Sequence, residues 1–403
     1  MKILHFFITK IFFKRWILVL GMIILLFLAN YLSFTATRSI ISTYQGYQEM
    51  EYLNQKGTFI ANLDPDSESD FNKIELDDTK NVYEYLNDNY TYALQVNGFI
   101  SSLHSKDNME VSFNYINEES YKTKQFKLSQ GNHLNFNYKE EIPILVGVGL
   151  SKTYPVGSSI EIKDPITHKL VNLKVQGVLE KNTYQSNFYA PNSKNYFNFA
   201  VFLPINEDFI QKSSLDLHVN GLMELALLST SKEEAMKLSK FIEEKLDLKF
   251  NFFSQQENFT YFEDYYTNSL KIICSITFIL LLLTIVLATW NTLISIRLMI
   301  KDFTINLLVG LSYSKLRLIF YSYFGILFSI NIIILFIIVA FNRYSFWLNK
   351  DSILATYGIF GLISMDWLSI LTVILIDFII GFIIVEITIK KIKKIPISVG
   401  VLT

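Results

Sequence analysis

Residues Leu270–Ile296, LKIICSITFILLLLTIVLATWNTLISI, decide the fold of this chain. Apart from Lys271, the stretch contains no charged residue. At ~1.5 Å per residue, a helix of this length crosses a hydrocarbon core of roughly 30 Å. We therefore predict a membrane span here. A long polar region precedes this span, and mostly apolar runs joined by short segments follow it.

The composition agrees with a membrane protein that also carries a large polar domain. Of 403 residues, 51% are hydrophobic and only 18% are charged, which is more apolar than an ordinary soluble protein. The single cysteine, Cys274, lies inside the span just described, so the chain cannot form an intrachain disulfide. The polar domain must therefore depend on an apolar core of its own.

The amino-terminal residues predict another span. Residues 1–15 carry Lys2, Lys10, Lys14 and Arg15 without an acid, and an uncharged apolar run follows from Trp16 to Ala36. A signal peptide also begins with basic residues, but its apolar region is usually about 7–15 residues long and ends in a small-residue cleavage motif. This run is longer and its nearest such motif, residues 35–37, is poor, so we interpret it as an uncleaved span.

Residues between the two spans predict a mixed α and β domain. Residues 39–56 look like a polar helical stalk that continues the first span. Short apolar or alternating runs separated by Asn, Asp, Ser, Gly and Pro predict strands. They are residues 58–63, 90–96, 110–115, 142–148, 159–162 and 170–178. Residues 80–87 and 231–246 predict helices, the second of which begins with a capping box from Ser231 to Glu234.

Basic residues in the short segments predict the orientation. Two further apolar runs, residues 318–341 and 367–389, bring the number of expected spans to four. Lys and Arg accumulate on the cytoplasmic side of a membrane protein. The amino terminus, residues 297–317 and the carboxyl tail are all rich in Lys and Arg, whereas in residues 342–366 two bases are balanced by two acids. We therefore expect both termini inside and the large domain outside the cell membrane.

The predicted architecture has three parts. Residues 1–38 are a cytoplasmic start and the first span, and residues 39–267 are an extracytoplasmic α+β domain with stalk helices. Residues 268–403 are a three-helix membrane domain that includes a cytoplasmic segment, 297–317, and an outer loop, 342–366. Acidic residues outnumber basic ones in the outer domain, which argues against nucleic acid as a partner.

Three stretches of the chain resemble the FtsX-like and MacB-like permeases of ATP-binding cassette (ABC) systems. In the outer domain, residues 126–182 carry a glycine-marked turn at Gly131 and strands at 144–146, 157–162 and 175–179 in the order of that family's MacB-like domain. Residues 294–324, ISIRLMIKDFTINLLVGLSYSKLRLIFYSYF, are similar to the family's cytoplasmic segment. The basic tail, residues 389–403, also resembles the family's ending. The glutamate that usually follows the basic residues is replaced by Lys301-Asp302.

The resemblance implies a non-catalytic permease subunit that works with a cytoplasmic ABC ATPase dimer. The chain has no GxxxxGK[ST] phosphate loop, so we expect the partner to bind ATP and Mg and this chain to carry no cofactor. A second permease chain, identical or different, is implied, and a membrane-fusion or extracellular protein is a further candidate partner. Residues 302–311 predict a short amphipathic helix at the lipid interface that contacts the ATPase. The expected coupling residues are Arg297, Lys301, Asp302, Leu307, Leu308, Gly310, Ser312 and Lys315.

Other candidate sites are weaker. Asp377 lies near the middle of the last span, where a carboxylate costs roughly 3 kcal/mol, so we expect a buried contact with Asn291, Asn331, Thr284 or a second chain. A role in proton coupling is the alternative. Residues 64–75 imitate a calcium loop, but Ser69 replaces the required glycine, so we interpret them as an exposed acidic loop. The histidines show no metal-ligand spacing, and no catalytic residue is proposed.

The function expected from the sequence is ATP-driven export of a peptide, an antimicrobial compound or an amphiphile. Movement of the cytoplasmic segment would reach the outer domain through the stalk helices, which is called mechanotransmission. The alternative is a membrane-anchored regulator that controls a cell-wall hydrolase or a sensor kinase. What the outer domain binds distinguishes these two functions.

Overall fold

The computed structural model describes residues 16–67, 70–103, 110–124, 126–139, 141–167, 169–298 and 300–394. The chain divides into two compact units. The helical unit consists of the described parts of Met1–Ile41, Tyr266–Phe341 and Ser364–Thr403. The mixed unit consists of the described parts of Ser42–Tyr265 and Asn342–Ile363.

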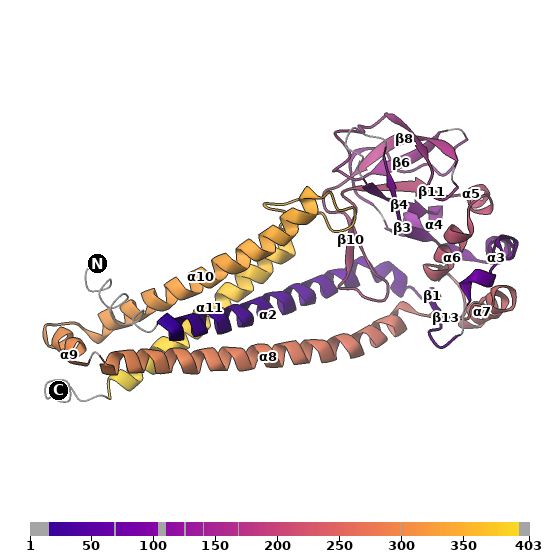
Figure 1. The fold of residues 1–403 in the computed structure, drawn as a ribbon. Helices are drawn as coiled ribbons and strands as arrows, with labels where there is room; N and C mark the ends of the chain where they lie inside the picture. Colours follow the sequence, from indigo (N-terminus) through magenta and orange to yellow (C-terminus); the bar gives the residue numbers. More distant parts are fainter. Residues whose placement is uncertain are drawn as a thin grey trace. The chain divides into compact units, whose positions relative to one another are not determined.

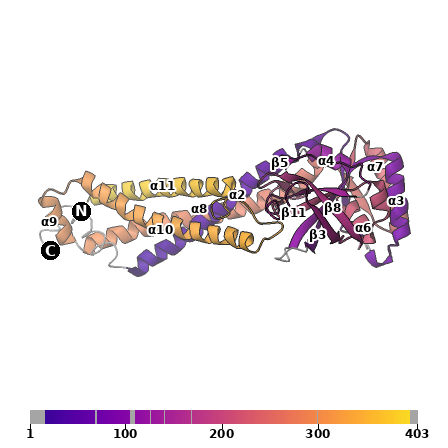
Figure 2. The ribbon, with the colours of Figure 1, turned by 90° about the horizontal axis from the view of Figure 1, so that it is seen from above.

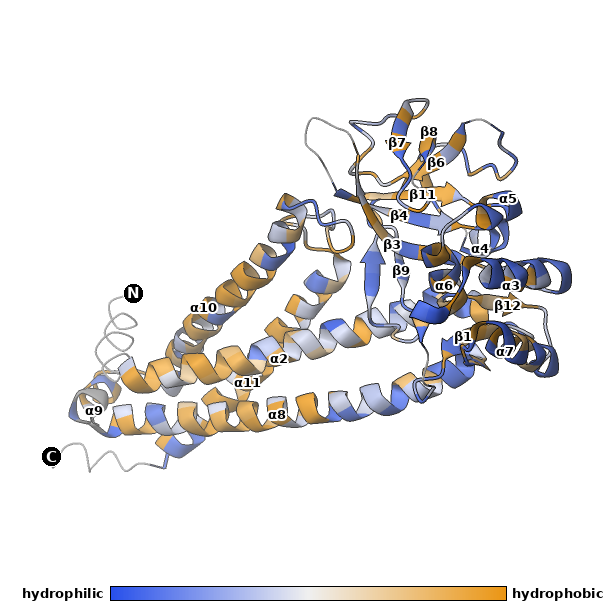
Figure 3. Ribbon diagram, turned by 45° about the vertical axis from the view of Figure 1, so that its right-hand side comes forward, coloured by the Kyte–Doolittle hydropathy of each residue, from blue (hydrophilic) through white to orange (hydrophobic). Residues whose placement is uncertain are grey.

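Four helices in the described residues are long and apolar enough to cross a membrane. They are α2 (Trp16–Glu49), α8 (Gln255–Leu298), α10 (Tyr313–Leu348) and α11 (Ser364–Ile392). Orange, apolar residues dominate these helices over the lengths that belong to the helical unit (Figure 3). The structure therefore contains four candidate membrane helices and a mixed α and β unit, as the sequence predicts.

Three of these helices extend past the boundaries of the helical unit. α2 and α10 continue past Ile41 and Phe341, and α8 begins before Tyr266, so each contributes a helical segment to the mixed unit. α8 starts at a reciprocal capping box: Glu257 accepts a hydrogen bond from the Ser254 N–H at 2.7 Å, and the Glu257 N–H donates to Ser254 Oγ at 3.2 Å. This capping motif was not recognised in the sequence.

The mixed unit contains a four-stranded antiparallel sheet in the order β13-β1-β12-β2. Its strands β1 and β13 are labelled in Figure 1. Its strands are β1 (Phe59–Leu63), β2 (Thr91–Ala93), β12 (Ala226–Leu228) and β13 (Phe250–Phe253). Helices α3 (Leu76–Asn89), α6 (Leu215–Met223) and α7 (Lys232–Leu246) pack against it. The Ser231 side chain caps α7 by accepting from the Glu234 N–H, so the predicted helix start is confirmed.

A seven-stranded sheet forms the rest of the mixed unit, in the order β3-β4-β11-β6-β8-β5 with β7 also paired to β8. The β4–β11 and β6–β8 pairs are parallel, and the other pairs are antiparallel. The strands are β3 (Gln95–Ser102), β4 (Glu110–Ile116), β5 (Leu128–Gly131), β6 (Ile142–Val146), β7 (Ser159–Lys163), β8 (Leu170–Leu179) and β11 (Ala200–Pro204).

The remaining elements of the mixed unit are short. They are the 3₁₀ turns η3 (Glu51–Asn54) and η4 (Phe71–Lys73), helices α4 (Glu118–Lys124) and α5 (Glu207–Gln211), and the hairpin of β9 (Tyr184–Ser186) and β10 (Lys194–Tyr196). One apolar core joins both larger sheets through strand residues and the inner faces of α3, α6 and α7.

One predicted strand is wrong. Residues 90–96 are divided between β2 and β3, which belong to different sheets. The chain changes sheet at Leu94, where the Asn117 side chain replaces ladder hydrogen bonds: its Oδ1 accepts from the Leu94 N–H at 2.9 Å and its Nδ2 donates to the Tyr92 carbonyl at 2.8 Å. A side chain distant in sequence makes the break, so local periodicity did not reveal it.

The buried His218 makes the stability of the mixed unit depend on pH. Its ring contacts Thr79 Oγ1 and the Ile210 carbonyl, both at 2.7 Å, and burial lowers its pKa below the usual 6.5. Because the folded state then binds fewer protons than the unfolded state, stability should fall as pH drops below about 6.5.

We expect the unfolding temperature of the detergent-solubilised chain to fall more between pH 7.5 and 5.5 in the wild type than in His218→Gln. The free energy of unfolding can change by at most about 1.4 kcal/mol per pH unit through the binding of one proton. Parallel curves for the two proteins would show that His218 is not the responsible group.

Candidate functional site

The predicted coupling segment contains a short helix, α9 (Ile300–Leu308). It ends in a Schellman motif: Gly310 has φ +105°, its N–H donates to the Leu307 carbonyl at 3.1 Å, and the Leu311 N–H donates to the Asn306 carbonyl at 2.9 Å. Ser312 then caps α10 by accepting from the Lys315 N–H at 3.3 Å. Glycine is suited to this position because the left-handed conformation costs it little.

The two leucines proposed as coupling residues have different environments. Leu307 is partly buried and packs against the buried cluster of the helical unit, whereas the Leu308 side chain is 65% exposed. Val309 is 83% exposed and Ile305 is 50% exposed, so α9 and the residue after it present three apolar side chains to their surroundings. Val309 and Ile305 were not proposed from the sequence, although their helical spacing from Leu308 would have indicated a shared surface.

The charged residues of this segment fall into two groups. Arg297, Lys301 and Lys315 are exposed. Asp302 belongs to α9, but its side chain lies outside the described set. Arg317 instead forms a two-point ion pair with Glu386 of α11, with Nε to Oε1 at 2.9 Å and Nη2 to Oε2 at 3.2 Å. Arg317 therefore joins two helices of its own unit.

Asp377 contacts a residue that the sequence did not suggest. Its Oδ2 accepts a hydrogen bond from Asn30 Nδ2 of α2 at 3.0 Å, and both side chains are buried. The expected partners were Asn291, Asn331, Thr284 or a second chain. Thr284 donates to the Leu280 carbonyl of its own helix at 2.8 Å. The amide of Asn331 donates to the Leu327 carbonyl of its own helix at 3.1 Å, and Asn291 is buried. The sequence did offer a signal for this contact, because Asn30 is a polar amide within the first apolar run.

A second polar contact joins the same two helices. Arg38 Nε of α2 lies 3.0 Å from Asp366 Oδ1, and Asp366 in the first turn of α11 is fully buried. The helix dipole also favours a carboxylate at this end of α11. Because a buried charge that loses its partner is costly, this pair should contribute substantially to the stability of the helical unit.

We expect Arg38→Met to destabilise the helical unit by about 3 kcal/mol, the lower end of the range for a broken buried pair, because Arg38 is partly exposed. Asp366→Asn should cost less, because it removes the buried charge itself. The exposed Lys73–Asp70 pair at 3.5 Å supplies the control, and Lys73→Met should change stability by less than about 0.5 kcal/mol. The free energy of unfolding would be measured by denaturant titration in detergent. Equal losses in Arg38→Met and Lys73→Met would contradict this expectation.

Within the mixed unit, the end of α2 is held against the β9–β10 hairpin. Three polar contacts and one close approach make up this clamp. Ser42 Oγ donates to the Asn192 carbonyl at 2.8 Å, Lys194 Nζ donates to Gln45 Oε1 at 2.6 Å, Glu49 Oε2 accepts from the Ser186 N–H at 2.9 Å, and Gly46 lies against the backbone of Pro191. We call these eight residues the stalk clamp. It fixes the helix to the hairpin over nearly two turns.

The start of α8 packs beside the same part of α2. The Tyr47 and Phe259 rings lie 4.5 Å apart, and the Tyr47 hydroxyl donates to Glu263 Oε1 at 3.0 Å. The fully buried Gln255 donates through Nε2 to the Phe188 carbonyl in the loop of the hairpin at 3.2 Å. Both stalk helices therefore contact the hairpin.

Polar side chains connect the hairpin to the larger sheet. Gln95 of β3 donates to Gln185 of β9 at 2.5 Å and accepts a hydrogen bond from Lys124. Burial lowers the pKa of Lys124 to about 8 and raises that of Glu224, which accepts from Asn97, to about 7. These contacts give the hairpin a polar, tightly bonded base.

The segment between α10 and α11 also belongs to the mixed unit. Asn182 donates to the Tyr357 carbonyl at 2.8 Å and accepts from its N–H at 2.6 Å, and Asn198 donates to the Ala355 carbonyl at 2.8 Å. The ring of Trp347 lies 5.2 Å from that of Phe199. Hydropathy alone predicts residues 342–366 as an outer loop of the membrane domain, because it reports only which residues can enter a membrane.

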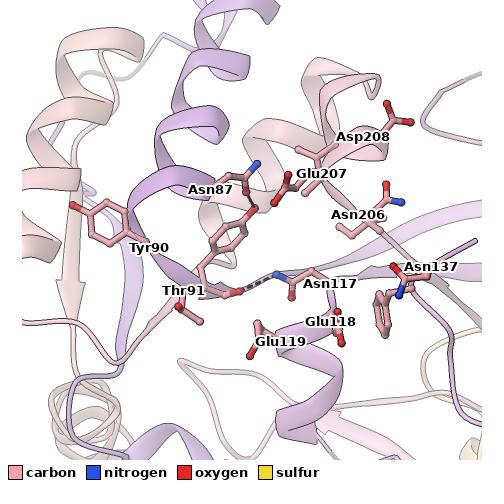
Figure 4. A pocket seen from close by; sticks show the side chains of 14 residues that line it. Asn87, Tyr90, Thr91, Asn117, Glu118, Glu119, Asn137, Asn206, Glu207 and Asp208 are labelled. Atoms are coloured by element: carbon pink, nitrogen blue, oxygen red, sulfur yellow. Dashed lines mark hydrogen bonds between the residues drawn. The ribbon is translucent and has the colours of Figure 1, made fainter.

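A pocket of about 560 Å³ opens in the mixed unit. Figure 4 shows carboxylate, amide and aromatic side chains around it. The Tyr92 hydroxyl donates to Asn87 Oδ1 at 2.6 Å. Its carboxylates come from Glu118, Glu119, Glu207 and Asp208. Lys122 forms ion pairs with Glu118 and Glu119, and Lys212 forms an ion pair with Asp208. These acids also begin α4 and α5, where the helix dipole favours them.

No metal site emerges from the described residues, which contain no group of three or more His, Cys, Asp or Glu side chains placed to hold an ion. In the segment that imitates a calcium loop, Asp64 pairs with Lys249 at 2.7 Å. Residues 68 and 69 of that segment lie outside the described set.

The fold defines a class: a protein with four candidate membrane helices and a mixed α and β unit, most of which lies between the first and second of them in sequence (Figures 1 and 2). No family model and no curated protein matches the chain. Among solved structures, it is similar to the extracellular domain of the noncanonic ABC-type transporter YknZ from Gram-positive bacteria. That likeness has 12% identity and a TM-score of 0.31, and it covers 49% of this chain and all of the other. A TM-score this low does not establish a shared fold.

Proposed function

We propose that this chain is the permease subunit of an ABC transporter. In this proposal, ATP hydrolysis by a separate cytoplasmic ATPase dimer moves the helical unit of two permease chains. The movement reaches an extracytoplasmic mixed unit, which exports a peptide, an antimicrobial compound or an amphiphile.

The continuity of α2, α8 and α10 carries this proposal. Each of these helices has an apolar part in the helical unit and a further helical part in the mixed unit. A helix is stiff along its axis because every turn is hydrogen-bonded to the next. A tilt or shift at the end near α9 is therefore transmitted along the helix to the stalk clamp, with no flexible linker in α2 or α8 to absorb it.

The exposed apolar residues of α9 support the position of the ATPase. Ile305, Leu308 and Val309 lie between basic side chains in a segment that the positive-inside rule places in the cytoplasm. An apolar surface of this kind on a short, capped helix suits insertion into a groove on a partner protein. ATP and Mg would be held by that partner, since the chain lacks a phosphate loop.

The acidic pocket supports a cationic cargo. Carboxylates and aromatic rings together favour an ammonium or guanidinium group, the first through charge and the second through cation–π contact. Lys122 and Lys212 neutralise part of this negative charge from within their own helices.

The test is purification of the chain from membranes of its source, followed by reconstitution in nanodiscs with whatever ATPase co-purifies. We expect an ATPase with two nucleotide sites per complex, and hydrolysis that a cationic amphiphilic peptide stimulates. Efflux of that peptide from proteoliposomes should require ATP. If a cell-wall hydrolase or a sensor kinase co-purifies and no ATPase does, the chain is the membrane-anchored regulator.

A further inference from the structure

The geometry points to a binding site for one anionic glycerophospholipid, in a groove of the helical unit between the last turns of α8 and α11. The groove has a volume of about 490 Å³ and is apolar along most of its length, with Val286, Leu293 and Ile387 among its lining residues. Arg297 and Lys391 also line it. The inference holds in any bilayer and does not depend on the proposed transport function.

Both cations lie at the same end of the groove. Arg297 and Lys391 are each one residue from the end of their helix. Side chains on a helix lean toward its amino terminus, so both reach back over the groove and away from the helix ends. Among the described residues, neither is paired with a carboxylate, in contrast to Arg317, which Glu386 neutralises. Two unneutralised cations above an apolar groove are complementary to a phosphate that carries acyl chains.

An unpartnered hydroxyl provides an independent sign of a ligand. Thr289 lines the groove, is 6% exposed, and its Oγ1 has no hydrogen-bond partner among the described residues. Other threonines of α8 satisfy themselves within the helix: Thr277, Thr284 and Thr292 donate to the carbonyl four residues earlier at 2.7–2.8 Å. A buried hydroxyl without a partner costs free energy unless a ligand supplies one.

The spacing along α8 matches the order of groups in a glycerophospholipid. Arg297 and Thr289 are eight residues apart on α8, about 12 Å along the helix axis. Because helix side chains lean toward the amino terminus, we expect the Arg297 guanidinium to lie closer to Thr289 than its backbone does. A glycerol backbone separates the phosphate from the ester carbonyls, which are hydrogen-bond acceptors for a hydroxyl. Trp290 also lines the groove and is 60% exposed, and indole rings favour the polar–apolar boundary of a membrane.

The test titrates the full-length chain in detergent with dioleoylphosphatidylglycerol or dioleoylphosphatidylcholine and counts bound lipids by native mass spectrometry. We expect one tightly bound phosphatidylglycerol per chain and weaker binding of phosphatidylcholine. Arg297→Gln with Lys391→Gln should weaken phosphatidylglycerol binding about 25-fold, about fivefold per charge, and leave phosphatidylcholine nearly unchanged. Lys301→Gln with Lys390→Gln removes two exposed cations outside the groove lining and should change neither affinity by more than about twofold.

Thr289→Val separates a specific site from a general attraction to charge, and its similar shape preserves the fold. It should weaken both lipids about fivefold, the size of one hydrogen bond, without changing their ratio. Three results would overturn the site: equal affinity of the wild type for the two lipids, equal losses in the groove variant and its control, or a lipid-free dimer that the groove variant dissociates. The last result would make the groove an interface between two chains.

Discussion

Leu308→Asp combined with Val309→Asp is expected to release the ATPase from the complex. Both side chains are largely exposed at the end of α9, so two carboxylates there leave the packing of the helical unit intact. A carboxylate that is buried without a partner in an apolar interface costs several kcal/mol. We expect at least about a hundredfold weaker association, measured by co-purification and by ATP hydrolysis in nanodiscs.

Two further variants give this experiment its controls. Ser314→Asp adds a carboxylate at an exposed position in the first turn of α10 and should leave the ATPase bound. Leu307→Asp should instead destabilise the chain, because Leu307 packs against the buried cluster of the helical unit. An ATPase that stays bound to the Leu308/Val309 variant would place the coupling surface elsewhere.

Gly46→Ala is expected to uncouple ATP hydrolysis from movement of the mixed unit. A Cβ at Gly46 would meet the backbone of Pro191, with its carbonyl carbon at 2.7 Å and its Cα at 2.9 Å. Backbone atoms cannot rotate away as a side chain can, so the end of α2 must separate from the hairpin, at a cost of about 1–3 kcal/mol. Peptide efflux per ATP should fall at least tenfold, while the ATPase remains bound and active.

Gly21→Ala is the matched control for this change. Gly21 lies in the same helix, and a Cβ there meets no atom within 4 Å. Both substitutions raise helix propensity by up to about 1 kcal/mol, so a difference between them reports the stalk clamp and not the helix. If efflux falls equally in both variants, or in neither, the clamp is not the path of transmission.

Only part of the coupling segment could be predicted from the pattern of its side chains. A short amphipathic helix in the coupling segment could be predicted because amphipathic spacing is a local signal, although the helix runs from Ile300 to Leu308 and not over residues 302–311. Which of Leu307 and Leu308 faces outward could not, because both fit an amphipathic helix and only the packing of the other helices distinguishes them. The roles of the coupling residues remain predictions until the ATPase experiments are made.

Three features could be predicted from local sequence: the number of candidate spans, the mixed α and β character of the chain between the first two, and the start of α7 at Ser231. Each of these depends on residues close together in the chain, through apolar length, alternation or capping. Tertiary structure alone decided the Asn30–Asp377 contact, the stalk clamp, the division of residues 90–96 and the docking of residues 342–363 on the mixed unit. In each of these a polar or backbone group is satisfied by a residue distant in sequence, and hydropathy carries no information about that choice.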